Sequence, residues 1–147
     1  MKTIIKRPHF FFFGLIPFFV LIGLLYSDAI IDLTISNEYF SLNVNYWCIF
    51  CAVFVGLFGV NYATLKWIRK QPRKDLTLLH VVLQTSAILL FLLFLTNINP
   101  ENNIIEKLFP HTLNYYAILN NSFFLFGASV VIHMINFFQC LFLKTHE

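Results

Sequence analysis

Four long apolar stretches alternate with shorter polar segments along the chain. They run roughly over residues 10–26, 44–65, 76–96 and 115–143. An α-helix rises ~1.5 Å per residue, so about 20 apolar residues cross the hydrocarbon core of a bilayer. The first stretch is shorter and contains Pro17, and its aromatic run 10–13 would lie at the membrane boundary. The pattern predicts an all-α membrane protein: a single transmembrane domain over residues 1–147, folded as an antiparallel four-transmembrane-helix bundle.

Basic residues gather on one side of this predicted bundle. Nine of the ten lysines and arginines fall in the N-terminal segment, the loop between the second and third spans, and the C-terminal tail: Lys2, Lys6, Arg7, Lys66, Arg69, Lys70, Arg73, Lys74 and Lys144. The opposite side carries Lys107 and five of the seven acidic residues: Asp28, Asp32, Glu38, Glu101 and Glu106. Cytoplasmic loops of membrane proteins carry an excess of Lys and Arg. We therefore expect both termini to be cytoplasmic.

The composition excludes a soluble globular domain. Of 147 residues, 59% are hydrophobic and 12% are charged, so a soluble fold would expose too much apolar surface. The expected partner is the lipid bilayer, and the net charge of +3 does not indicate nucleic acid. Because Tyr26-Ser27-Asp28 does not fit the small-x-small pattern of a cleavage site, the first stretch is expected to be an uncleaved span. The topology suits a bacterial inner (cytoplasmic) membrane, and it is compatible with a monomer or a dimer.

Two further patterns concern packing. Segment 34–42, in the first outer loop, contains an alternation of apolar and polar residues and is expected to be extended. In the second span, small residues recur at i, +4, +8, +11 and +15, which places them on one helix face: Cys48, Ala52, Gly56, Gly59 and Ala63. Small residues let helices approach closely in lipid. This stripe is therefore expected to pack inside the bundle.

Polar residues inside the spans form the candidate site: Asn61, His80, Gln84, His133, Asn136 and Gln139. His80 and Gln84 share one helix face, as do His133 and Asn136. Because an unpaired polar group in hydrocarbon is costly, we expect these side chains to face the bundle and bond one another. A proton path and a pair of haem ligands, His80 and His133, are the functional alternatives. Counting residues from the span ends places the two histidines at different depths, which disfavours a shared haem. The remaining histidines are expected at the solvated surface: His9, His111 and His146.

The segment 32–47 resembles the main subunit of the haem–copper respiratory oxidases, at the outer loop and helix start of its last four helices. The family reads Asp-Ile-x-Leu-His-Asp-Thr-Tyr-Phe there. Identical matches are Asp32, Tyr39 and Phe40, and matches in kind are Leu33, Ile35 and Leu42. Further along, similar residues of the family fall at 52–54, His80, Asn121 and Gly127. The resemblance covers most of the chain and implies a shared four-helix scaffold.

Departures from the family decide what the resemblance implies about function. The two family histidines that bind haem iron fall on Val44 and Tyr46, and the His-Asp pair of its loop falls on Ser36 and Asn37. Valine has no lone pair to offer a metal, and ligation by histidine needs an imidazole nitrogen. The resemblance therefore implies a scaffold without haem, copper or oxygen chemistry, with no catalytic, cofactor-binding or metal-binding residues and no cofactor. The expected role is a non-catalytic accessory or scaffold subunit, with other membrane subunits as candidate partners.

A membrane redox enzyme is the alternative. Cys48-Ile49-Phe50-Cys51 lies at the outer end of the second span, where a four-helix disulfide oxidase that reduces quinone also carries Cys-x-x-Cys. That chemistry needs a reactive thiolate and normally a second cysteine pair. Here the outer loops contain no cysteine, and Cys140 lies near the opposite membrane face. The other form of this alternative is a b-type haem carrier that uses His80 and His133.

Overall fold

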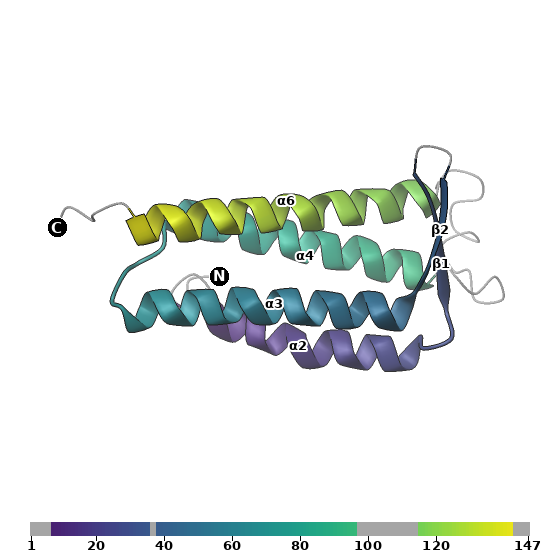
Figure 1. The fold of residues 1–147 in the computed structure, drawn as a ribbon, viewed down its shortest axis with the longest axis horizontal. Coiled ribbons are helices and arrows are strands. Elements are labelled where there is room, and N and C mark those ends of the chain that lie inside the picture. Colours follow the sequence, from purple (N-terminus) through teal and green to yellow (C-terminus); the bar gives the residue numbers. More distant parts are fainter. Residues whose placement is uncertain (1–6, 36–37, 97–114, 143–147) are drawn as a thin grey trace. The chain divides into compact units, whose positions relative to one another are not determined.

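Four helices and one hairpin make up the computed structural model, which describes residues 7–35, 38–96 and 115–142 (Figure 1). The helices are α2 (Pro8–Leu25), α3 (Val44–Trp67), α4 (Lys74–Thr96) and α6 (Tyr115–Phe142). They cover the four apolar stretches of the sequence. Each is long and apolar enough to cross a membrane, so the prediction of a mostly helical chain with four candidate spans is confirmed.

The chain divides into two compact units. The first contains residues 1–73 and 137–147, and the second contains residues 74–136. The first unit therefore holds α2, the hairpin, α3 and the end of α6, whereas the second holds α4 and the larger part of α6. The expectation of a single domain over residues 1–147 stays a prediction.

The hairpin of the first unit connects α2 to α3 (Figure 1). Strand β1 (Ile30–Ile35) pairs antiparallel with β2 (Glu38–Asn43), with Ile30 opposite Asn43 and Ile35 opposite Glu38. The alternating segment 34–42 is therefore extended, as predicted, in its described residues. Pairing gives the strands' backbone groups hydrogen-bond partners that lipid could not supply.

Asn43 fixes the junction between the hairpin and α3. Its side-chain oxygen accepts a hydrogen bond from the backbone N–H of Asn45 at 2.8 Å, which caps the first turn of α3. Its Nδ2 donates to the carbonyl oxygen of Ser27 at 2.9 Å. One side chain thus begins α3 and holds it to the turn that follows α2.

Helices α2 and α3 pack closely at two glycines, Gly23 and Gly59. A Cβ atom added to Gly59 would lie 2.6 Å from the ring of Phe13, and one added to Gly23 would lie 3.1 Å from Cβ of Cys48. Phe13 contacts Gly59, and the later residue Gly23 contacts the earlier residue Cys48. The two helices are therefore antiparallel. The small-residue stripe of α3 supplies these contacts, and its members are buried or half-buried: Cys48, Ala52, Gly56, Gly59 and Ala63.

Aromatic packing continues this contact toward the start of α2. Phe12 is fully buried, stacks on Tyr62 with ring centroids 5.5 Å apart, and meets Phe58 edge-on at 5.6 Å. Because α2 begins at Pro8, His9 lies within the helix and is 7% exposed. The expectation of a solvated His9 is therefore wrong. The other two histidines expected at the surface, His111 and His146, lie outside the described residues.

Candidate functional site

Buried polar side chains line the facing sides of α4 and α6 in the second unit. We call this group the polar seam, and its seven members are buried: Thr77, His80, Gln84, Ser122, Ser129, His133 and Asn136. Six of them are 0% exposed, and Ser122 is 4% exposed. Their spacing of three, four or seven residues along each helix places them on one face of that helix.

Side-chain hydrogen bonds join the two helices. Asn136 Nδ2 donates to Thr77 Oγ1 at 3.0 Å, and Ser129 Oγ donates to Gln84 Oε1 at 2.6 Å. The partners again run in opposite directions along the two helices, so α4 and α6 are antiparallel within this unit. Each bond places a buried polar atom of one helix against a polar atom of the other, where lipid would offer no partner.

The two histidines lie between these bonds. The ring centroids of His80 and His133 are 4.9 Å apart and the ring planes are tilted by 43°. The expectation of different depths is therefore wrong. Asn136 lies at the same level as Thr77, which is in the first turn of α4. The depth of His133 counted from residue 143 is therefore too large.

The histidine pair does not fit a haem. Two imidazoles that ligate one iron from opposite faces of a porphyrin, with metal–nitrogen bonds of ~2 Å, have ring centres about 6 Å apart. The observed 4.9 Å leaves no space for a porphyrin plane between the rings. Among the described residues, moreover, no group of three or more His, Cys, Asp or Glu is placed to hold a metal ion.

The seam is interrupted toward the start of α6. Ser122 Oγ donates to the carbonyl oxygen of Ala87 at 2.9 Å, but seven residues separate Ser122 from Ser129, or about 10 Å at the rise of a helix. Buried apolar side chains, Ile88 and Phe126, fall within this interval. A proton relay needs consecutive donors and acceptors within hydrogen-bond reach, so the described side chains do not form a continuous path.

Sequence reasoning singled out the seam only in part. It named His80, Gln84, His133 and Asn136 but not the hydroxyl residues, which lie on the same faces: Thr77, Ser122 and Ser129. Their signal is the spacing, because Ser129 precedes His133 by four residues and Thr77 precedes His80 by three. The other two predicted members, Asn61 on α3 and Gln139 on α6, belong to the first unit.

The cysteines of α3 serve packing. Cys48 and Cys51 are thiols in the structure and are 0% and 2% exposed. Cys48 lies against Gly23 of α2, so its small side chain allows the close approach of the two helices. Disulfide exchange requires that a thiolate reach a second sulfur, and burial of this degree hinders that access.

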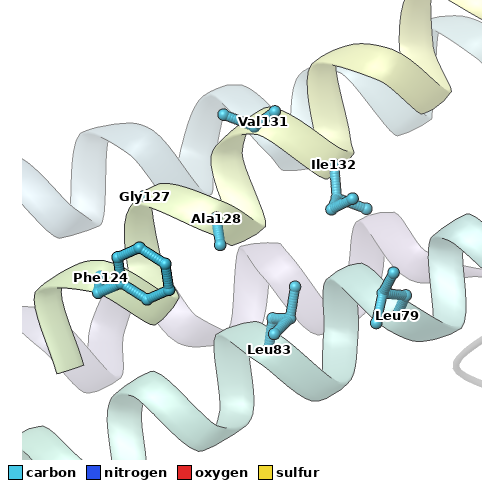
Figure 2. Close-up of a pocket in the computed structure, with 7 residues that line it drawn as sticks. All are labelled: Leu79, Leu83, Phe124, Gly127, Ala128, Val131 and Ile132. Atoms are coloured by element: carbon cyan, nitrogen blue, oxygen red, sulfur yellow. The ribbon is translucent and has the colours of Figure 1, made fainter. Parts of the chain in front are cut away.

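An apolar groove lies on the second unit (Figure 2). It has a volume of about 530 Å³ and is lined by Leu79 and Leu83 of α4 and by Phe124, Gly127, Ala128, Val131 and Ile132 of α6. In Figure 2 the two leucines point from α4 toward α6, and a Cβ atom added to Gly127 would meet no atom within 4 Å. The lining side chains are all apolar, so the groove offers shape but no polar chemistry.

Five of the seven seam residues thus take part in hydrogen bonds between α4 and α6: Thr77, Gln84, Ser122, Ser129 and Asn136. Comparison of the chain with models of known protein families, with curated proteins and with solved structures finds no match. The assignment of a role therefore rests on the geometry of the polar seam and on the sequence.

Proposed function

We propose that this chain is a non-catalytic integral membrane protein that acts as an accessory or scaffold subunit. The observation that supports this role best is the polar seam: its hydroxyl and amide groups are buried and bond to the opposite helix. A catalytic polar group must reach a substrate, whereas Thr77, Gln84, Ser129 and Asn136 are fully buried and bond across between α4 and α6. We further propose that the four helices form an antiparallel bundle, with both termini in the cytoplasm of a bacterial cell.

The proposed relation to the main oxidase subunit rests on the sequence resemblance alone. Asp32, Tyr39 and Phe40 carry the identical positions of that motif. At the positions of the family's haem ligands, Val44 is fully buried and Tyr46 is 69% exposed. Neither valine nor tyrosine offers an imidazole nitrogen, which supports the proposal of a scaffold without the haem ligands, whose partners are other membrane subunits.

Purification of the full-length protein in mild detergent tests the scaffold role. We expect one or more membrane subunits to co-migrate in stoichiometric amount, and we expect an absorbance spectrum without a Soret band. A stoichiometric Soret band that is lost in His80→Ala or His133→Ala would overturn the non-catalytic proposal. A reporter fused to the C-terminus separately tests sidedness, since periplasmic activity of that reporter contradicts the proposed topology.

The thiol form of the redox alternative needs its own measurement. Cys48 and Cys51 are the only pair at the right spacing in the sequence. Alkylation with a mass tag, in unfolded protein taken rapidly from membranes with and without reductant, counts oxidised thiols. Both thiols are buried in the folded protein, so we expect them to stay reduced there and to be labelled equally with and without reductant. Labelling that rises only after reduction would favour the thiol oxidase.

A further inference from the structure

Five basic residues gather at one end of the first unit. Arg7 immediately precedes α2, Lys66 lies in the last turn of α3, and the others follow α3: Arg69, Lys70 and Arg73. The antiparallel packing of α2 on α3 brings Arg7 and Lys66 together, and both act electrostatically on His9. The acidic residues among the described part of this unit lie at the other end, in or beside the hairpin: Asp28, Asp32 and Glu38. The nearest acidic residue along the chain is Asp75, two residues after Arg73, so the basic end carries a net positive charge.

The end of α3 positions one of these cations by an unusual backbone. The N–H of Lys70 donates to the carbonyl of Leu65 at 2.9 Å, and the N–H of Arg69 donates to the carbonyl of Lys66 at 3.1 Å. This is the Schellman pattern, in which the residue after the helix takes the left-handed conformation and is usually glycine. Here that residue is Arg69, with φ of 60°. Residues other than glycine rarely adopt this backbone conformation, yet the residue here is an arginine. An arginine at a strained position points to a role for its charge.

Two other cations hold the turn in place. Lys70 Nζ donates to the carbonyl oxygen of Leu141, in the last turn of α6, where helix carbonyls carry partial negative charge. Arg73 Nη1 donates to Gln139 Oε1 at 3.5 Å. These contacts all lie within the first unit. At the end of α3 and in this turn, the exposed cations are Lys66, Arg69 and Arg73.

Trp67 favours a position of this turn at the depth of lipid headgroups. It lies beside Lys66 and is 85% exposed, and tryptophan is enriched where the apolar core of a membrane meets the headgroups. Basic residues beside a span are attracted to anionic lipids. We propose that Lys66, Trp67 and Arg69 form a binding site for the phosphate group of an anionic phospholipid, on the turn that Lys70 and Arg73 hold.

Lipid titration of the full-length protein in zwitterionic detergent tests this site. Native mass spectrometry would count bound phosphatidylglycerol, with phosphatidylcholine as the neutral lipid. We expect Lys66→Gln and Arg69→Gly each to weaken phosphatidylglycerol binding about fivefold, and the double variant to weaken it about 25-fold. Binding of phosphatidylcholine should not change. Arg69→Gly suits the left-handed backbone, and Arg69→Asn is a second variant that tolerates it.

A charge-conserving double variant, Lys66→Arg with Arg69→Lys, serves as the matched control and should retain affinity within about twofold. Far-UV circular dichroism checks that every variant is folded. Equal phosphatidylglycerol affinity in the wild type and the Lys66→Gln, Arg69→Gly double variant would overturn the proposal. Inorganic phosphate is the last arm: if it binds as tightly as phosphatidylglycerol and displaces it, the ligand is free phosphate and the assignment to lipid fails.

Discussion

The hydrogen bond from Ser129 to Gln84 should contribute measurably to stability, and a double-mutant cycle gives its magnitude. The donor and acceptor oxygens are 2.6 Å apart, and both residues are 0% exposed. Ser129→Ala removes the donor and leaves the amide oxygen of Gln84 buried without it, which costs about 1–3 kcal/mol by analogy with soluble proteins. Interhelical bonds measured in membranes average ~0.6 kcal/mol and reach ~1.7. We therefore expect Ser129→Ala to lower the free energy of unfolding by about 1–2 kcal/mol.

The second single variant, Gln84→Leu, removes the buried amide and leaves a serine hydroxyl, which can bond a carbonyl of its own helix. We expect a loss of about 0.5–1 kcal/mol for this variant. The double variant should lose less than the sum of the singles by about 1 kcal/mol, because the same bond is removed only once. Unfolding by sodium dodecyl sulfate in mixed micelles, followed by circular dichroism, measures all four free energies.

Thr85→Ala is the matched control for this cycle. Its Oγ1 donates to the carbonyl of Val81 at 2.7 Å, within α4 itself, so its loss should change stability by less than about 0.5 kcal/mol. The reasoning is refuted if the coupling energy between Ser129 and Gln84 is zero within error, or if Ser129→Ala unfolds no more easily than Thr85→Ala. Either result would mean that the polar seam does not hold the second unit together, and the structural argument for a non-catalytic role would lose its support.

Three further predictions concern the first unit, each measured as a free energy of unfolding. Gly59→Leu should lower it by about 1–3 kcal/mol because Phe13 occupies the space, whereas Gly14→Leu, with no atom within 4 Å, should be near neutral. Asn43→Ala should lose about 1 kcal/mol with its cap, and Asn43→Asp, which keeps the accepting oxygen, should lose less. Arg69→Gly should gain about 1 kcal/mol by relieving the left-handed backbone, so an unchanged or lower stability would contradict the strain.

The helices could be predicted from the sequence because a helix that crosses lipid must be long and apolar. The described helices begin and end within two residues of the stretches first delimited. The largest shifts have local reasons. Helix α2 begins at Pro8, whose fixed φ suits the first helical position, and α3 continues to Trp67 because the Schellman turn closes only at Arg69.

The partners of the seam could not be read in the same way. Thr77, Ser122 and Ser129 are ordinary residues in an apolar span, since a hydroxyl can bond its own helix, as Thr85 does here. Which hydroxyl groups bond to the neighbouring helix depends on the residues that this helix places opposite them. The relative depth of two residues on different helices likewise depends on how those helices are staggered. Lengths of apolar stretches do not give that stagger, which is why His80 and His133 were expected apart and are in contact.

The stagger itself explains why a scaffold would keep a polar seam. In lipid no hydrophobic force favours one register of two apolar helices, because lipid and leucine are equally apolar. The seam removes that freedom: sliding α6 by one turn would carry Ser129 from Gln84 to the level of His80, and Asn136 away from Thr77. Both bonds would break in hydrocarbon, where no water replaces them. In a transporter such polar groups would indicate a proton path, but here they set one register of α4 and α6. A scaffold needs a fixed register in order to present a constant surface to a partner.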